Sequence, residues 1–242
     1  LYADNELKGS KTVTAEEGWN YSFTGLSKYR DGGVEIVYTV KEVQDYENAG
    51  KYTSEVVGNN IINTHTPEKV DVEGSKTWED ANNQDGKRPT SITVKLLKNG
   101  TEYTRKTVSA AADGSWSYSF TDLPKYEGGQ EIVYSVQEEA IDEYETAYED
   151  NNIINTHTPE KVAVEGSKTW NDGDNQDGKR PSSITINLYG NNELVDSKIV
   201  TADNGWKWSF TGLDKYADGK EINYTITEEE EAGYTGVVDG FN

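Results

Sequence analysis

Apolar and polar residues alternate along the chain in short runs that are separated by Gly, Asp and Asn turns. Because successive side chains of a strand point to opposite faces, each run predicts a half-buried strand. In the central part of the chain the inward positions of four runs are Val70, Val72, Gly74, Lys76 and Trp78; Ile92, Val94 and Leu96; Trp116, Tyr118 and Phe120; and Ile132, Tyr134, Val136 and Glu138. Lys98-Asn99-Gly100 has the composition of a hairpin turn. Helical periodicity is not sustained, so the pattern predicts an all-β chain of antiparallel β-sandwiches.

The run that closes one sandwich and opens the next occurs twice. Residues 59–70 read N-N-I-I-N-T-H-T-P-E-K-V, residues 151–162 repeat these letters, and V-E-G-S-K-T-W follows at 72–78 and at 164–170. Such spacing is typical of a tandem array with one folding unit per period. We therefore expect a partial repeat over 1–66 that lacks its opening strands, a complete repeat over 67–159, and a repeat over 160–242 that stops at Asn242 before its closing strand. The linkers contain Pro67 and Pro159, which makes them stiffer than Gly/Ser tethers and predicts an extended rod.

The charge balance argues against two classes of partner. The chain carries 44 acidic and 23 basic residues, a net charge of -21, and therefore repels nucleic-acid phosphates and anionic lipids. No apolar run approaches the roughly 18 residues of a membrane-spanning helix. We expect no nucleic-acid binding and no membrane insertion of this fragment. The chain has no cysteine, so disulfides cannot reinforce these small domains as they do in many secreted proteins.

Two charged residues and one amide interrupt the predicted core faces. Lys76 and Glu138 each continue an apolar alternation, and Asn155 lies among the isoleucines of the closing strand. Lys and Glu are almost never fully buried unless they are paired. One interpretation places both at strand ends, where their side chains reach water. The other is a buried set, because Lys168 and Glu228 interrupt the pattern at the same positions of the third repeat.

Three motifs carry a resemblance to a known family: the V-E-G-S-K-T-W opening, the Y-x-V/I-x-E strand and the I-I-N-T-H-T-P closing strand. In this order they resemble the Cna B-type repeats of Gram-positive cell-surface adhesins and pilins. The resemblance implies an immunoglobulin-like sandwich in which a lysine of the first strand and an asparagine of the last form a spontaneous isopeptide bond, assisted by a buried glutamate. These roles fall on Lys76, Asn155 and Glu138. Partial sets are Glu42 and Asn63 in the first repeat and Lys168 and Glu228 in the third.

The chemistry of an amide exchange fits these residue types. A lysine attacks a carbonyl only as the neutral amine, and burial lowers the pKa of Lys76 because the charged form loses solvation. A protonated Glu138 can donate to the Asn155 carbonyl oxygen and move protons as ammonia leaves. The cross-link would close a loop of roughly 80 residues, worth about 4.5 kcal/mol in the chain-entropy model. This is a single-turnover maturation step, so we expect neither an enzyme nor a cofactor.

An acidic loop is the one candidate metal site. The segment N-D-G-D-N-Q-D-G at 171–178 brings Asp172, Asp174 and Asp177 close together, but their spacing misses the calcium-binding pattern. The equivalent loop at 79–86 has one aspartate fewer. We expect an acidic turn and no bound metal.

The aromatic residues and histidines have structural interpretations. Trp19, Trp116 and Trp206 fall on the apolar strand parity, so we expect them to pack in cores rather than to form sugar-stacking platforms. His65 and His157 lie in the linkers beside a proline, without a Cys or acidic cluster in the local sequence, and we expect both to be solvated.

The leading hypothesis is a stalk or spacer in a cell-wall-anchored surface protein of a Gram-positive bacterium, exposed outside the cell. Partners would be host extracellular matrix or other cell-surface ligands, bound through other parts of the parent protein. Near-identical repeats favour a spacer, because a binding face usually needs one distinctive unit. Two alternatives are a ligand-binding adhesin module that recognises matrix protein or glycan, and the accessory β-domain of a secreted carbohydrate-active enzyme.

Overall fold

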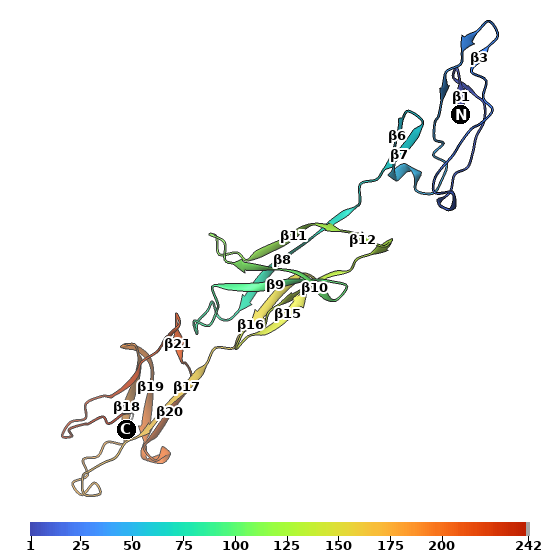
Figure 1. The fold of residues 1–242 in the computed structure, drawn as a ribbon. Helices are drawn as coiled ribbons and strands as arrows, with labels where there is room; N and C mark the ends of the chain where they lie inside the picture. The colour runs from blue at the N-terminus through green and yellow to red at the C-terminus, as the bar shows by residue number, and fades with distance from the viewer. Residues whose placement is uncertain (241–242) are drawn as a thin grey trace. The chain divides into compact units, whose positions relative to one another are not determined.

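Figure 1 shows the computed structural model, which describes residues 1–240. The chain divides into two compact units. The first unit holds Leu1–Lys69 and Pro124–Gln130, and the second unit holds Val70–Leu123 and Glu131–Asn242. In the described residues the helices are three 3₁₀ turns, η1 (Ala15–Glu17), η2 (Ala49–Lys51) and η3 (Ala202–Asn204). None of them could cross a membrane. The all-β fold class is confirmed.

The first repeat, in the first unit, is built from short strands. They are β1 (Tyr2–Ala3), β2 (Glu6–Leu7), β3 (Tyr29–Arg30), β4 (Val34–Glu35), β5 (Tyr38–Thr39), β6 (Thr53–Val57) and β7 (Asn60–Thr64). Among the described residues of this unit, the buried apolar side chains are only Ala3 and Ala49. Trp19 is 69% exposed, so its predicted core position was wrong. Its counterpart Trp116 packs edge-on against Trp78 of the strand Lys69–Glu79, which covers its face in the middle repeat.

The middle repeat forms two sheets over a common core. Its strands are β8 (Lys69–Glu79), β9 (Ser91–Lys98), β10 (Thr101–Ser109), β11 (Ser117–Pro124), β14 (Tyr134–Glu138), β15 (Glu145–Glu149) and β16 (Asn152–Thr156), with the short pair β12 (Tyr126–Glu127) and β13 (Gln130–Glu131) between β11 and β14. One sheet has the order β10-β9-β14 and the other β11-β8-β16-β15. The predicted inward positions form the core, and Val94, Leu96 and Ile153 are completely buried. The alternation therefore placed the core faces of this repeat correctly.

Strand direction differs from the sequence-based expectation at one pair. The closing strand β16 runs parallel to the opening strand β8, with Ile153 opposite Lys76 and Asn155 opposite Trp78. The pairs β10–β9, β14–β9 and β15–β16 are antiparallel as predicted, so the parallel pair is a local exception. A period-two pattern reports which face a residue occupies and carries no information on strand direction. Parallel pairing is possible here because the intervening strands carry the chain from the end of β8 back to its beginning.

Glycines at two positions of the middle repeat have specific steric roles. Asn99 and Gly100 both have positive φ angles, 50° and 81°, in the predicted turn between β9 and β10. Gly74 lies in β8, where an added Cβ would come within 2.1 Å of the Asn151 carbonyl oxygen and 2.6 Å of the Tyr118 hydroxyl. The Tyr118 hydroxyl donates a hydrogen bond to that same carbonyl. Gly74 therefore makes room for a contact between the opening strand and the turn before the closing strand.

The third repeat has a similar core and fewer long strands. Its strands are β17 (Lys161–Ser167), β18 (Ser183–Gly190), β19 (Glu193–Thr201), β20 (Lys207–Asp214), β21 (Tyr216–Ala217), β22 (Lys220–Glu221) and β23 (Tyr224–Glu228). They form the pairs β17-β20 and β21-β22 and the sheet β19-β18-β23. Within residues 229–240 no strand follows β23. Asn242, at which we expected the repeat to stop, lies outside the described residues.

Candidate functional site

The inward-facing lysine of the opening strand meets the inward-facing glutamate of β14. Lys76 Nζ lies 3.6 Å from Glu138 Oε1, and both side chains are fully excluded from water. Lys76 Nζ also lies 4.3 Å from the centre of the Trp78 ring, a geometry that suits a cation–π contact. The interpretation that places these residues at solvated strand ends is therefore excluded for the middle repeat.

Burial changes the acidity of the Lys76 amine. Loss of solvation lowers its pKa to about 8, against the opposing effect of Glu138 and, more weakly, of Asp80. The physical cause is that an ammonium ion is more costly than a neutral amine in an apolar core. A larger fraction of Lys76 is thus nucleophilic near neutral pH than for an exposed lysine.

Asn155 lies in the neighbouring strand and has an unusual polar environment. Its side chain is completely buried, and neither Nδ2 nor Oδ1 has a hydrogen-bond partner among the described residues. Thr146, the register partner of Asn155 on β15, donates a hydrogen bond from its hydroxyl to Glu138 Oε2 at 3.2 Å. Each buried polar group without a partner costs roughly 1–3 kcal/mol. Asn155 is therefore a buried amide without hydrogen-bond partners, paired in register with the threonine that binds Glu138.

Two supporting side chains were not found from the sequence. Thr146 holds one oxygen of Glu138, and the Tyr148 hydroxyl accepts a hydrogen bond from the Glu138 main-chain N–H at 2.9 Å. Both lie on β15, a segment for which the sequence analysis predicted no strand. The alternation of E-T-A-Y-E over 145–149 is the signal that could have predicted it.

The partial sets in the other repeats are more open. Lys168 Nζ donates to Glu228 Oε2 at 2.6 Å, and these side chains are 17% and 16% exposed. In the first repeat Asn63 Nδ2 donates to Glu42 Oε1 at 2.8 Å, at a solvent-exposed position. Both predicted pairs are thus brought together. The middle repeat alone, among the described residues, holds a lysine, a glutamate and an asparagine of the predicted set.

The acidic loop is closed by arginine. Asp172 accepts hydrogen bonds from Arg180 Nη2 and Nε at 2.5 and 2.9 Å, and Asp80 accepts from Arg88 at 2.6 and 3.0 Å. No group of three potential metal ligands is found within residues 1–240. The Asp172 and Asp80 carboxylates therefore close their own loops through an arginine eight residues later.

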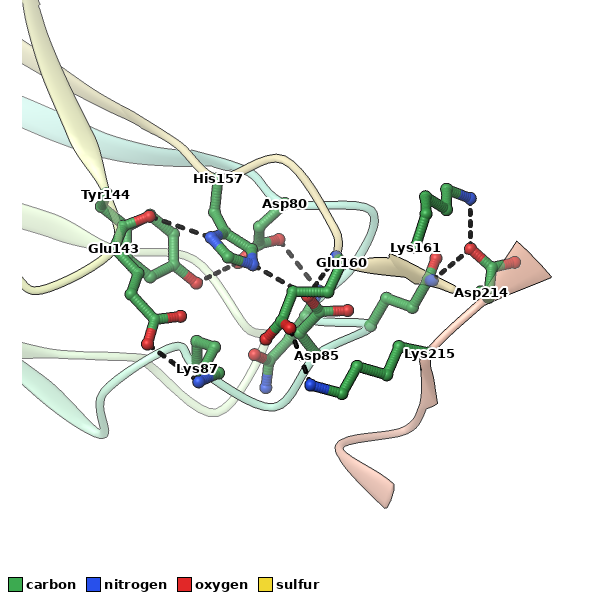
Figure 2. A network of polar contacts seen from close by, with 12 residues as sticks. Asp80, Asp85, Lys87, Glu143, Tyr144, His157, Glu160, Lys161, Asp214 and Lys215 are labelled. Carbon is green, nitrogen blue, oxygen red and sulfur yellow. Dashed lines mark hydrogen bonds and ion pairs between the residues drawn. The ribbon is translucent and has the colours of Figure 1, made fainter. Parts of the chain in front are cut away.

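The expectation that both linker histidines are solvated was wrong for His157. His157 is 8% exposed, and its ring contacts Asp85 Oδ2 through Nε2 at 3.0 Å and the Glu143 carbonyl through Nδ1 at 2.9 Å (Figure 2). His65 makes the equivalent carbonyl contact with Lys51 but is exposed, as expected. The contact could not be predicted from the local sequence because Asp85 lies 72 residues before His157.

A family model settles the relationship of these three repeats. The model described as the Cna protein B-type domain matches residues 1–64, 72–156 and 164–242. The chain belongs to this family. The predicted resemblance to Cna B-type repeats is therefore confirmed.

Two relatives of these Cna B-type repeats are proteins of Staphylococcus aureus. The chain is 39% identical over 246 residues to the collagen adhesin of Staphylococcus aureus, a match that covers 99% of the chain and 20% of the relative. It is 25% identical over 265 residues to the serine-aspartate repeat-containing protein D of S. aureus strain Newman, covering 93% and 19%. The chain thus spans about a fifth of the length of these curated relatives.

A solved structure shows the same tandem arrangement of domains. The crystal structure of two B repeat units, B1B2, of the collagen binding protein of S. aureus matches with a TM-score of 0.63 and 39% identity. The match covers 99% of the present chain and 64% of that structure. The Cna B-type fold, a tandem array of β-sandwich repeats, is therefore shown for this chain.

Proposed function

We propose that these Cna B-type repeats are stalk or spacer segments of a cell-wall-anchored adhesin or pilin-like protein, and that an autocatalytic Lys76–Asn155 isopeptide bond rigidifies the middle repeat. The observation that carries the bond is a buried lysine with a lowered pKa beside a buried glutamate and an unsatisfied asparagine amide. The stalk role is supported by the tandem repeats and by the similarity to a collagen adhesin. Binding to host matrix would then belong to other parts of the parent protein on the outside of a Gram-positive cell.

The proposed reaction exchanges one amide for another. The neutral Nζ of Lys76 attacks the Asn155 side-chain carbonyl carbon, while a protonated Glu138 donates to the carbonyl oxygen. The C–Nζ bond forms, the C–Nδ2 bond breaks, and one proton passes from Nζ through Glu138 to the leaving nitrogen, which departs as ammonia. The fold contributes by holding the reacting groups together in a dry core.

The product also accounts for the polar atoms that the core leaves without partners. After the exchange the ammonium charge is absent and the buried Asn155 NH2 group has left. Since uncompensated buried polar groups are costly, both changes relieve a penalty that the unreacted core bears. The cross-link further restricts the unfolded chain, by about 4.5 kcal/mol in the entropy model.

The intact mass of the denatured chain tests the bond. One cross-link predicts a mass about 17 Da below that calculated from the sequence, because one ammonia is lost. Lys76→Ala, Glu138→Ala and Asn155→Ala should each have their full calculated mass. Lys168→Ala is the matched control and should keep the deficit, since it removes the equivalent lysine of the third repeat. A full mass for the wild-type chain, or a deficit that survives Lys76→Ala, overturns the assignment.

A further inference from the structure

The loop between the first two long strands has the same framework in two repeats. In the middle repeat the Asp80–Arg88 pair closes the loop and Asn83 adopts a φ of 62°; in the third repeat Asp172–Arg180 closes it and Asn175 has the same φ. Each arginine also lies over a tryptophan ring of its own repeat, at 5.5 and 5.6 Å. The shape of this loop is therefore set within each repeat, whether or not another repeat is docked on it.

The far end of the middle-repeat loop contacts the third repeat. Gln84 Nε2 donates to Asp214 Oδ1 at 2.7 Å, and the Gly219 main-chain N–H donates to the Gln84 carbonyl at 2.9 Å. A Cβ added at Gly86 would come within 2.6 Å of the Gly219 Cα atom. Both glycines have positive φ angles, 71° and 72°, so two turns meet here backbone to backbone.

Asp85, at the centre of this loop end, binds the linker between the repeats. Its Oδ2 accepts hydrogen bonds from His157 Nε2 at 3.0 Å and from the Glu160 main-chain N–H at 2.8 Å (Figure 2). The Asp85 side chain is 1% exposed. The two bonds approach one carboxylate oxygen from linker residues on either side of Pro159, which limits the conformations open to the linker.

The linker is also fastened to the repeat after it. The Lys215 main-chain N–H donates to the Glu160 carbonyl at 3.0 Å, and Lys215 Nζ donates to Glu160 Oε2 at 2.8 Å. Lys125 makes the same two bonds to Glu68 in the first linker. The Glu160-Lys161 segment is therefore bound to the repeat that follows it in the chain. The loop end of the preceding repeat contacts this segment from the other side.

The third repeat offers a matched comparison, because its loop has the same framework with nothing docked on it in the described part of the chain. Gln176 and Asp177 are exposed, whereas Gln84 is partly buried and Asp85 is buried. A Cβ added at Gly178 would meet no atom within 4 Å. The Gln-Asp-Gly end has the same sequence in both loops but is covered only in the middle repeat, which is where the next repeat makes contact.

We propose that the Gln-Asp-Gly end of this loop is a docking surface for the linker and for the β21–β22 hairpin of the next repeat, which begins at Lys215 and Tyr216 in the third repeat. Gln84, Asp85 and Gly86 hold the third repeat in this way. Gln176, Asp177 and Gly178 present the same surface to another repeat that begins with His-Thr-Pro-Glu-Lys. The partner is thus a further Cna B-type repeat, recognised by a histidine and a main-chain N–H on one side and a glycine turn on the other.

The charge of His157 is set by its two partners. A main-chain carbonyl and a carboxylate both accept hydrogen bonds, so the protonated imidazole, in which both ring nitrogens donate, is the form that satisfies both partners. Burial opposes this charge, but the bonds to Asp85 and to the Glu143 carbonyl outweigh it and raise the pKa of His157. The His157–Asp85 contact therefore stabilises docking fully when the pH is below the ordinary histidine pKa. This stabilisation is lost as the pH rises through the raised pKa of docked His157.

The other groups that face this histidine are already engaged. The Tyr144 ring lies against the His157 ring at 5.3 Å, and its hydroxyl donates to Asp80. The Glu143 carboxylate pairs with Lys87 at 2.9 Å, and Glu160 pairs with Lys215. Asp85 is thus the carboxylate whose partner changes when His157 loses its proton.

Paired spin labels on the full chain test the docking surface. Because the chain has no cysteine, Thr104→Cys and Glu193→Cys place nitroxides on one exposed strand position of each repeat. Double electron–electron resonance at about pH 6 should give one narrow distance distribution, and Asp85→Asn should broaden it at least about twofold, as expected when domains move freely. Asp177→Asn, the matched control, should leave the width unchanged. Equal widths for the wild type and Asp85→Asn overturn the proposal.

Two further measurements separate docking from a local folding defect. Gly86→Ala and Gly178→Ala carry similar backbone strain, but only Gly86→Ala should broaden the spin-label distance distribution. Equal effects of the two variants would contradict docking.

The two histidines of the chain can be followed by NMR titration. Asp85→Asn should lower the pKa of His157, because the hydrogen bond from the ring to the Asp85 carboxylate raises it, while leaving the His65 signals in place. An unchanged His157 titration would overturn the Asp85 contact. None of these readouts depends on the isopeptide bond.

Discussion

Lys76 Nζ and Glu138 Oε1 lie 3.6 Å apart in a core from which water is excluded on both sides of the pair. The distance is longer than a good hydrogen bond, and Glu138 Oε1 has no hydrogen-bond partner among the described residues. A buried ion pair with such geometry is weak evidence of stabilisation, since desolvation can exceed the attraction. This geometry is compatible with the proposed role of the two side chains as reacting groups.

Removing the Lys76 amine should destabilise the middle repeat specifically. Lys76→Ala should lower its free energy of unfolding by about 4.5 kcal/mol, the value of the lost cross-link. Hydrogen exchange at the buried β9 residues Val94 and Leu96 reports this repeat, and Ile186 and Leu188 on β18 report the third. In Lys168→Ala, protection at Val94 and Leu96 should stay at the wild-type level. Equal protection of β9 in the wild type and in Lys76→Ala would falsify the stabilising role.

The pH dependence of a variant that cannot react should show the buried amine. Asn155→Ala leaves Lys76 with a pKa of about 8 in the folded state and about 10.4 in the unfolded state. Between these values the unfolded chain binds more protons, so stability should rise with pH from about 8 to 10. Urea unfolding across this range measures it. The cross-linked wild type should lack the rise because an amide nitrogen does not titrate, and a flat profile in the variant would contradict the lowered pKa.

Gly74 should not tolerate a side chain. A methyl group there would overlap the Asn151 carbonyl and the Tyr118 hydroxyl, so Gly74→Ala should cost on the order of 3 kcal/mol. Gly50→Ala is a suitable control, because its Cβ would meet no atom within 4 Å and its φ is not positive. Thermal unfolding of both variants makes the comparison, and equal melting temperatures would show that β8 can move away from the turn.

The loop carboxylate Asp80 should contribute to stability in a pH-dependent way. Burial opposes its ionisation, but hydrogen bonds from Arg88, the Asn83 N–H and Tyr144 together lower the pKa of Asp80. Its contribution is therefore present above the ordinary aspartate pKa and is lost as pH falls through the lowered folded value. Asp80→Asn should lose about 3 kcal/mol at pH 7, because Arg88 loses its charged partner.

The measurement for Asp80 is urea unfolding of the wild type and Asp80→Asn at about pH 7 and pH 2. The difference between the two proteins should shrink at the lower pH, as the wild-type carboxylate takes up its proton. If the difference in free energy of unfolding does not change with pH, the effect of Asp80→Asn comes from the shape of the asparagine and not from the lost charge.

The alternation of the sequence predicted the four strands of the middle repeat that carry most of its core, with their inward faces, including the positions of Lys76 and Glu138, but it missed β15. This worked because a half-buried strand imposes a strict period of two on side-chain polarity. Burial of Asn155 was also predicted, from its place among isoleucines. The absence of hydrogen-bond partners around the Asn155 amide could not be predicted, because it depends on how Thr146 and Glu138 pair across strands.

Three features needed the structure because they depend on residues far apart in the chain. The parallel direction of β16 on β8 leaves no trace in polarity. The burial of His157 comes from Asp85, 72 residues earlier. Trp19 shares the local pattern of Trp116, yet it is exposed because the opposing strand, and not the local sequence, covers that face.

The parallel pairing of β8 and β16 determines how the middle repeat would respond to mechanical tension. A pull on the chain on either side of this repeat is applied at Lys69, where β8 begins, and at Thr156, where β16 ends. Since the strands run in the same direction, these two points lie at opposite ends of the pair, and the load runs along the strands. The evenly spaced hydrogen bonds between Lys76–Glu79 and Ile153–Thr156 are then sheared together instead of being opened one after another. We therefore expect this repeat to resist a pull along the chain more strongly than it would if the two strands were antiparallel and opened from one end.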